Sequence, residues 1–233
     1  MTIHEQLLAA VDGRRGAEAA DGLCEACVRL LAVDAAAISL VFDGTSSGTL
    51  GASGNLARAY DELQFTFGEG PCLDAVTLRL PMHVVDLTKE PRWPAYGPAM
   101  LAHDICAVYA VPIVVAAEFV GALDLFCAEP VQLGGEALAG ALVAAELAAI
   151  AVLDLLDADL QEAVSEPNSD AWAELNALSR SEVSQATGML VAQLGIEPAE
   201  ALVRLRAYAY TVGRSATDVA RDILDRRLEL ESE

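Results

Sequence analysis

The spacing of apolar residues changes twice along the chain, from helical to strand-like and back to helical. Residues 3–11 and 17–32 place apolar side chains three and four positions apart, which predicts two helices. Apolar runs of strand length follow at 36–42, 49–53, 81–86, 105–115 and 118–126. A tight turn separates the last two runs, as in an antiparallel hairpin. The pattern therefore predicts an α+β fold in which an antiparallel sheet is flanked by helices.

Three local signals refine the predicted secondary structure in the middle of the chain. Asn55 is a helix-capping residue and predicts a short helix that ends near Glu62. The glycine-rich segment Phe65–Cys72 predicts a loop that leads into a helix, with Pro71 in its first turn. Pro112 has no N–H to donate, so it indicates a bulge or an unpaired edge position within its strand.

Residues 136–165 form one long helical pattern whose first half is apolar nearly all round. Leu142 lies on one apolar stripe and Val143 on another, and a helix that is apolar on two sides needs two partners. We expect its own sheet to be one partner and the same helix of a second copy to be the other, which predicts a homodimer. Burial wholly within one chain is the alternative. Glu146 and Asp154 interrupt the run, which favours a buried helix over a membrane span.

The last part of the chain is purely helical. Helices are predicted at 171–194, 198–212 and 217–230. Gly195 and Gly213 fit helix ends, Pro198 fits a helix start, and Ser215 is placed to cap the last helix. We therefore divide the chain into a sheet-containing domain at 1–160, a linker at 161–170 and a three-helix module at 171–233.

Composition narrows the class of function. The 233 residues carry 14 basic and 35 acidic side chains, a net charge of −21, which argues against nonspecific DNA or anionic lipid as a partner. The start of the chain lacks a secretory signal, and an odd number of cysteines, five, suits reduced thiols, so we expect a cytoplasmic protein without membrane contact. Cys24 and Cys27 form a C-x-x-C pair that we interpret as core packing, because no second pair completes a zinc site.

Several motifs carry a resemblance to known families. Arg180, Gln185-Ala-Thr-Gly-Met-Leu190, Ala201-Leu-Val-Arg-Leu-Arg-Ala-Tyr-Ala209 and Asp218-Val-Ala220 resemble an ANTAR domain. Gly68-Glu-Gly-Pro-Cys-Leu-Asp-Ala75, Val111–Val115 and Val120–Leu125 resemble a GAF domain. The combination is similar to the GAF–ANTAR regulators of actinobacteria. The resemblance implies a dimer that holds paired stem-loops in nascent RNA, prevents a terminator hairpin from forming, and is controlled by its GAF domain, with a small molecule or a kinase as possible input.

The RNA-binding candidates combine small, polar, basic and aromatic side chains, since specific RNA recognition targets splayed bases and phosphates. They are Arg180, Gln185, Ala186, Thr187, Gly188, Arg204, Arg206, Tyr210, Arg214 and Arg221. Arg204 and Arg206 lie two apart on one helix and cannot point the same way. Gly188 in mid-helix has two explanations, close packing against Ala209 or contact with RNA. Thr187 stands where the ANTAR family often has lysine, and any single arginine has a solvated surface position as its alternative.

A ligand pocket in the GAF-like domain has weaker support. Its candidate lining residues are Cys72, Tyr96, His103, Tyr109 and Phe126. His103 is a possible haem ligand, but a lone histidine before a strand more often makes a hydrogen bond or a cap, so we expect no cofactor and no metal. No P-loop, nucleophile elbow or paired catalytic carboxylates occur, so we expect no enzyme activity. The alternative function is a protein-interaction or dimerisation regulator whose helical module does not bind RNA.

Overall fold

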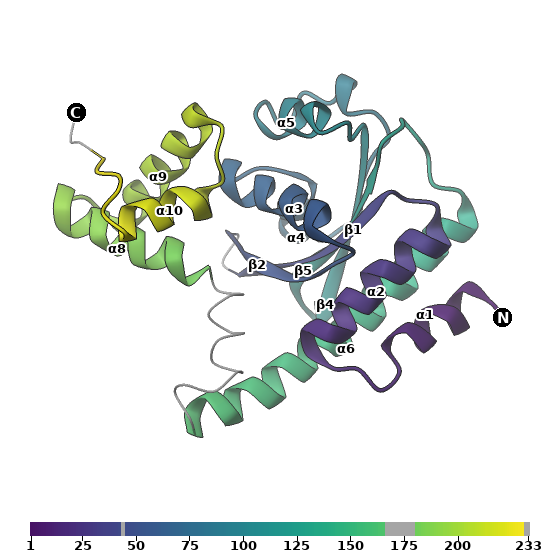
Figure 1. The fold of residues 1–233 in the computed structure, drawn as a ribbon. Coiled ribbons are helices and arrows are strands. Elements are labelled where there is room, and N and C mark those ends of the chain that lie inside the picture. Colours follow the sequence, from purple (N-terminus) through teal and green to yellow (C-terminus); the bar gives the residue numbers. More distant parts are fainter. Residues whose placement is uncertain (43–44, 166–179, 231–233) are drawn as a thin grey trace.

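The protein contains a five-stranded antiparallel sheet with helices on both faces (Figure 1). The structure, a computed structural model, describes residues 1–42, 45–165 and 180–230. The strands are β1 (Ala35–Phe42), β2 (Thr45–Ala52), β3 (Met82–Val84), β4 (Ala107–Val115) and β5 (Glu118–Cys127). Their order in the sheet is β2-β1-β5-β4-β3, and every neighbouring pair is antiparallel. The predicted α+β class with an antiparallel sheet is confirmed.

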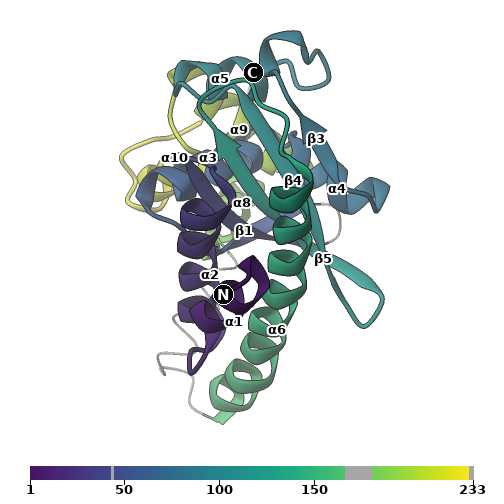
Figure 2. The same ribbon diagram turned by 90° about the vertical axis from the view of Figure 1, so that its right-hand side faces the viewer.

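One face of the sheet is covered by three helices. They are α1 (Ile3–Val11), α2 (Gly16–Leu31) and α6 (Gly135–Ser165). Figure 2 shows α2 and α6 side by side, with α1 against them. Leu23 of α2 and Ala144 of α6 are fully buried in the core that these helices form with the sheet, and Cys24 and Cys27 lie in the same core. Core packing of the C-x-x-C pair is therefore confirmed.

The opposite face carries shorter helices. They are α3 (Asn55–Phe67), α4 (Pro71–Leu78), the 3-10 turn η1 (Leu87–Lys89) and α5 (Tyr96–Ala102). Their buried side chains form a second core with the side chains that β1, β4 and β5 direct to this face of the sheet. Pro71 occupies the first turn of α4, as predicted. The two faces of the sheet therefore have separate cores.

The described part of the C-terminal helical module contains three helices and lies beside α3 (Figure 1). They are α8 (Ser181–Leu194), α9 (Pro198–Val212) and α10 (Ala216–Leu224). Gly195 and Gly213 end α8 and α9 in the left-handed conformation, and the Ser215 hydroxyl accepts a hydrogen bond from the Asp218 N–H at the start of α10. The predicted helix ends and the predicted cap of the module are confirmed. Residues 166–179, which include much of the predicted linker and the start of the first predicted helix, lie outside the described residues.

Two helix ends differ from prediction. Helix α3 continues to Phe67 because its first breaker is Gly68, which takes the left-handed φ of 68°, so the loop predicted from Phe65 onwards begins three residues later. Helix α10 ends at Leu224, because Arg226 has a positive φ of 56° and turns the chain back. Leu228 and Leu230 then pack on the module core as non-helical chain.

Pro112 occupies a place where β4 has a single neighbour. It lies opposite Ala122 of β5, whereas β3 pairs with β4 only from Val108 to Ala110. A register irregularity follows directly, between Ile113 and Val114. The position therefore satisfies both parts of the prediction, an unpaired edge with a bulge beside it.

Helix α6 is long and apolar enough to cross a membrane by length and composition alone. Its segment Gly135–Asp154 has a mean hydropathy of 2.0, and 44% of it is buried inside the structure. The buried side faces α2 and the sheet. The other side exposes Leu142, Ile150 and Leu153.

Candidate nucleic-acid interface

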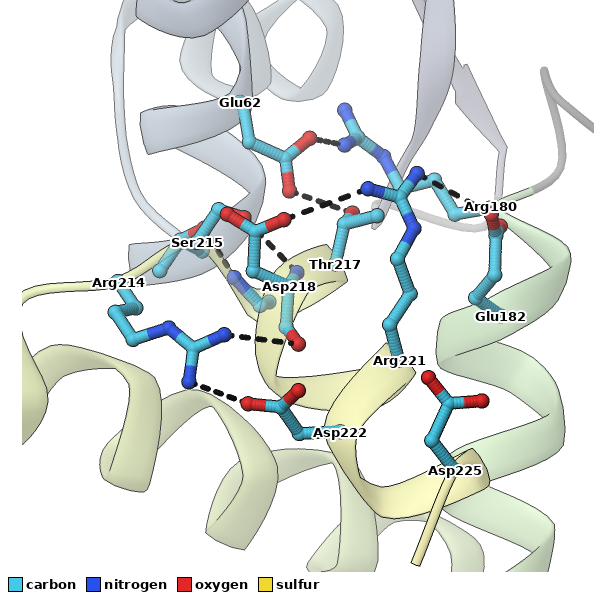
Figure 3. A network of polar contacts seen from close by, with 12 residues as sticks. Glu62, Arg180, Glu182, Arg214, Ser215, Thr217, Asp218, Arg221, Asp222 and Asp225 are labelled. Atoms are coloured by element: carbon cyan, nitrogen blue, oxygen red, sulfur yellow. Dashed lines mark hydrogen bonds and ion pairs between the residues drawn. The ribbon is translucent and has the colours of Figure 1, made fainter. Parts of the chain in front are cut away.

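Arg180 begins the described part of the helical module and is held by the sheet domain. Its side chain forms ion pairs with Glu62 and, at 3.6 Å, with Asp61, both on α3. Figure 3 shows the Glu62 contact, and only 6% of Arg180 is exposed. Burial lowers the pKa of the guanidinium, and the Asp61 carboxylate acts in the opposite direction. The first predicted RNA-binding arginine is therefore buried between the two parts of the chain.

Phe65 is the apolar centre of this contact. It lies in the last turn of α3 but packs into the core of the helical module. The Arg180 guanidinium lies 4.1 Å from its ring centroid and the Arg206 guanidinium lies 4.6 Å from it. A cation at this distance from an aromatic ring is attracted by the ring quadrupole. One phenylalanine of the sheet domain thus contacts two of the predicted RNA-binding arginines.

Arg180 pairs with carboxylates of α3, whereas Arg206 does not. Among the residues that the structure describes, none forms an ion pair with it, and its buried Nε has no hydrogen-bond partner. Burial, followed by the nearby Arg180 charge, lowers the pKa of Arg206 to about 10. The side chain therefore remains a cation at neutral pH, and no carboxylate of the described residues pairs with it.

Two hydrogen bonds fasten the start of α10 to α3. The Thr217 hydroxyl donates to Glu62 at 2.8 Å, and the Ala216 N–H donates to the Thr66 hydroxyl at 3.1 Å. Glu62 therefore contacts both Arg180 and Thr217, as Figure 3 shows. The contact between the two parts of the chain combines an apolar centre with several polar anchors.

The other predicted arginines lie on the surface of the module, each beside a carboxylate. Arg204 pairs with Glu200 at 3.0 Å, whereas Arg206 points to Phe65, so the expected divergence of these two side chains is confirmed. Arg214 pairs with Asp222 at 2.6 Å. Arg221 pairs with Glu182 at 3.3 Å and with Asp218 at 3.4 Å (Figure 3). Exposed pairs of this kind contribute little to stability and exchange partners easily.

Helix α8 places its RNA-binding candidates on different sides. Gln185 and Gly188 are exposed, whereas Ala186 is fully buried in the module core. Ala186 is therefore a packing residue, and its predicted RNA contact does not agree with the structure, because its side chain is enclosed in the module core. The Thr187 hydroxyl donates to the Val183 carbonyl within the helix at 2.7 Å.

Gly188 faces open space. A Cβ atom built at this position meets no other atom within 4 Å. Close packing against Ala209, one of the two explanations offered for this glycine, is therefore excluded. The exposed strip around Gln185 and Gly188 is accessible to a partner that approaches the helix backbone closely.

Tyr210 is 58% exposed and lies at the edge of the contact with the sheet domain. Its ring meets Phe67 in an edge-on arrangement, with a centroid distance of 5.6 Å. Ring faces of this kind are suited to stacking on bases or other flat groups. Tyr210 therefore contacts Phe67 but leaves more than half of its surface accessible to a partner.

The predicted ligand-pocket residues do not share one site. Cys72, Tyr96 and Phe126 belong to the core beneath α3, α4 and α5. Tyr109 packs on the opposite face of the sheet, where its hydroxyl donates to the Val131 carbonyl, so its assignment to the same pocket is wrong. The reason is strand periodicity, since Tyr109 and Phe126 point to opposite faces of the sheet. His103 is exposed, and its ring lies tilted against that of Tyr60 with a centroid distance of 5.9 Å.

Sequence reasoning missed a buried polar cluster near Cys72. The Ser39 hydroxyl contacts Asp61 and, at 3.1 Å, Asp124, while the Gln64 amide donates to Asp124 at 3.1 Å and accepts from the Cys72 N–H at 2.8 Å. Burial, then the Asp61 charge, raises the pKa of Asp124. The available signal was an aspartate within the apolar run Gly121–Leu125, which requires a buried partner.

Two polar atoms of this region find no hydrogen-bond partner within the described part of the chain. They are the Asp124 Oδ1 atom and the Tyr96 hydroxyl, and both residues are fully buried. Burial also raises the pKa values of the Cys72 thiol and the Tyr96 phenol, so both stay protonated. Among the described residues, no group of His, Cys, Asp or Glu side chains is arranged to hold a metal ion.

Comparisons with known families agree with this architecture. The GAF domain model matches residues 16–152, more than half of the chain, so the chain belongs to the GAF domain family. The ANTAR domain model matches residues 174–224. The chain therefore has the domain composition of a GAF–ANTAR regulator, in which the GAF domain is a sensory module and the ANTAR domain is an RNA-binding antitermination module.

Solved structures support the fold of the GAF domain alone. A GAF domain of a phosphoenolpyruvate-protein phosphotransferase from Coxiella burnetii is 19% identical with a TM-score of 0.55, and the match covers 69% of this chain and 95% of that one. The corresponding domain from Acinetobacter is 11% identical with a TM-score of 0.53, covering 67% and 93%. The fRMsr structure of Staphylococcus aureus in its reduced form is 13% identical with a TM-score of 0.50, covering 62% and 89%. No match was found among curated protein sequences.

Proposed function

We propose that this protein is an RNA-binding transcription antiterminator that acts as a homodimer and is regulated through its GAF domain. The observation that carries the proposal is the contact of Arg180 and Arg206, two ANTAR motif residues, with Phe65 of the GAF domain. In this arrangement α3 contacts Arg180 and Arg206, the side chains that would bind RNA. Release of α3 would make both arginines available to phosphates or bases of a stem-loop.

The remaining candidates support the same mode of action. Gln185 and Gly188 form an open strip on α8. Arg204 pairs with Glu200, and Arg214 pairs with Asp222 and also donates to the Asp218 carbonyl. Phosphates can replace such carboxylates, since the guanidinium binds both with similar geometry. Signal-dependent release of α3 would therefore extend an accessible surface that already exists on α8 and α9.

The proposed dimer uses helix α6. Leu142, Ile150 and Leu153 are 45–53% exposed and recur at helical spacing on the side that faces away from the sheet. A second copy of the same helix would cover this stripe and place two ANTAR domains in one particle, as recognition of paired stem-loops requires. We further propose that the protein acts in the cytoplasm by binding, without catalysis. The buried thiols of Cys24, Cys27 and Cys72 support this, because burial raises their pKa values and disfavours the reactive thiolate.

A titration with a fluorescent RNA that carries paired hexaloop stem-loops tests the function. We expect saturable binding by the wild type, a loss of tenfold or more in Arg206→Ala and Arg204→Ala, and no change in Arg29→Ala, an exposed arginine on α2. Affinity should fall steeply with salt, because phosphate contacts release counterions. Absence of saturable binding both by the wild type and by Glu62→Gln, in which the hold on Arg180 is weakened, would contradict RNA recognition.

A second candidate function is a protein-interaction regulator without RNA binding. It is favoured by the net charge of −21 and by the carboxylates that already neutralise Arg204, Arg214 and Arg221. In that case dimer formation through α6 persists while the RNA titration shows no binding. The same titration therefore separates the two functions.

A further inference from the structure

A cleft opens between the GAF and ANTAR domains on one side of their contact. Its volume is about 420 Å³. The GAF side contributes Thr66, Phe67, Gly68 and Ala95, and the ANTAR side contributes Val203, Arg206, Ala207 and Tyr210. Since both domains form its walls, the cleft exists only while they are in contact. Its size suits a small molecule, and pockets of this kind occur preferentially between domains.

Arg206 gives the cleft its charge. In a chain with 35 acidic and 14 basic side chains, no described carboxylate pairs with this arginine. The guanidinium lies close to the GAF wall, because a Cβ atom built on Gly68 would be 3.2 Å from Nη1. The cation has been partly removed from water, as its lowered pKa of about 10 also indicates, without the anion that would offset this cost.

Apart from Thr66, whose hydroxyl accepts from the Ala216 N–H, the remaining lining is mostly apolar and contains two aromatic rings. Phe67 and Tyr210 meet edge-on at 5.6 Å, one from each domain. Val203 is 62% exposed on the ANTAR wall, and Ala95 and Ala207 add small apolar surfaces. Such a lining favours a flat apolar body in contact with the rings.

We infer that this cleft binds a small anion that carries a flat apolar group, in the manner of an aromatic carboxylate or phosphate. The anionic group accepts charge-assisted hydrogen bonds from Arg206, and the flat group lies against Phe67, Tyr210 and Val203. A duplex or stem-loop RNA does not enter a space of this volume between two walls. The ligand is therefore a metabolite-sized molecule.

A ligand in this cleft stabilises the closed arrangement of the two domains. It contacts both walls, so it binds the closed form better than the open form, and any agent that requires the open form is then disfavoured. Under the proposed function, on which this regulatory step rests, RNA is such an agent, because it uses Arg206. Linkage makes the effect reciprocal, so RNA weakens the ligand by the same factor.

Isothermal titration calorimetry on the full chain tests the cleft. The probes are 2-naphthoate and 2-naphthyl phosphate as anions with a flat body, and 2-naphthalenemethanol as the uncharged body. We expect one anion per chain with a dissociation constant on the order of 1 mM or tighter, and binding of the alcohol at least about tenfold weaker. Equal binding of alcohol and anions, or no saturable binding of either anion, would overturn the inference.

Matched variants assign the binding to this cleft. Arg206→Gln removes the cation, and Val203→Glu places a carboxylate on an exposed position of the lining, where folding is expected to persist. Both should weaken 2-naphthoate at least about tenfold, while Arg204→Gln, two residues away and paired with Glu200, should not. Thermal melts verify folding. Wild-type affinity in both Arg206→Gln and Val203→Glu would show that the probe binds elsewhere and would overturn the inference.

An RNA titration separates this inference from the proposed function. If the stem-loop RNA binds and neither anion does, the cleft is overturned while the function stands. If the anions bind through Arg206 and the RNA never binds, the cleft stands and the function fails. If both bind, saturating 2-naphthoate should weaken the RNA at least about threefold, and an unchanged RNA affinity would overturn the regulatory step.

Discussion

Arg180 and Arg206 show how neighbouring groups decide what burial does to a charged side chain. Both guanidiniums lie on the Phe65 ring, and burial lowers the pKa of each. The ion pairs with Asp61 and Glu62 offset part of the free-energy cost of burying the Arg180 charge. Among the described residues, no carboxylate pairs with Arg206, and it retains capacity for an anion. The two arginines therefore have different roles in the closed form, one as an anchor and the other as a binding group.

Asp124 is a residue whose charge the GAF domain disfavours. It is fully buried, its pKa is raised mainly by burial and then by Asp61, and its Oδ1 atom has no partner. A carboxyl group with a raised folded-state pKa binds a proton that the unfolded chain releases. Its contribution to stability is therefore complete below the unfolded pKa of about 4, and is lost as pH rises towards the folded pKa.

The variant Asp124→Asn should remove this pH-dependent loss. Its amide can accept from Ser39 and Gln64 as the carboxylate does, without a buried charge. We expect a melting temperature at pH 7 that is higher than that of the wild type by about 2–4 °C, with a difference that shrinks towards pH 4. Differential scanning calorimetry from pH 4 to pH 8 measures this, with the exposed Glu129→Gln as control. A destabilised Asp124→Asn at pH 7 would show that the ionised carboxylate is needed.

At the scale of elements, the sequence predicted structure best where backbone chemistry decides it. Pro198, Gly195 and Gly213 begin or end helices as expected, since a missing N–H or a left-handed φ acts locally. The end of α3 was mispredicted because glycine-rich composition suggested a loop from Phe65. The helix continues to Phe67, and Phe65 is buried by residues of the ANTAR domain some 120 positions or more later. Contacts of that range have no signal in local spacing.

Helix α6 carries a prediction about assembly. Ile150 is 53% exposed on the apolar stripe, and in the proposed dimer a second α6 covers it. Ile150→Glu would bury an uncompensated charge there, so we expect a shift from dimer to monomer. Size-exclusion chromatography with light scattering distinguishes 24.4 kDa from twice that mass. Leu78→Glu, an equally exposed leucine on α4, is the control and should leave the assembly unchanged, whereas a monomeric wild type would contradict the dimer.

At the scale of the whole molecule, the unpredicted feature is the contact between the two domains. The motif residues of the ANTAR domain could be selected from sequence because their types suit RNA. The sequence does not tell which of them face solvent, and the structure divides the set into Ala186 in the core, Arg180 and Arg206 at α3, and Gln185 and Gly188 in the open. Packing inside the module buries Ala186, whereas packing between the two domains places Arg180 and Arg206. The contact between the domains depends on Phe65 and Glu62, which lie outside the family motifs.

Glu62 provides the means to shift the balance between the closed and open forms. It accepts from Arg180 and Thr217, so Glu62→Gln removes one ion pair and weakens one hydrogen bond of the contact without changing side-chain volume. Because the closed form occupies Arg180 and Arg206, a weaker contact raises the population that can bind RNA. We expect an RNA affinity about 3–10-fold higher than that of the wild type, measured by the fluorescence titration at fixed salt. Glu90→Gln, which breaks the Glu90–Arg92 pair inside the GAF domain, is the control and should leave RNA affinity unchanged. The contradicting outcome combines two results: Glu62→Gln binds RNA no better than the wild type, and hydrogen exchange shows that α3 and α10 have become less protected. The contact would then open without exposing the RNA-binding surface. Regulation would have to act on dimer formation through α6 instead.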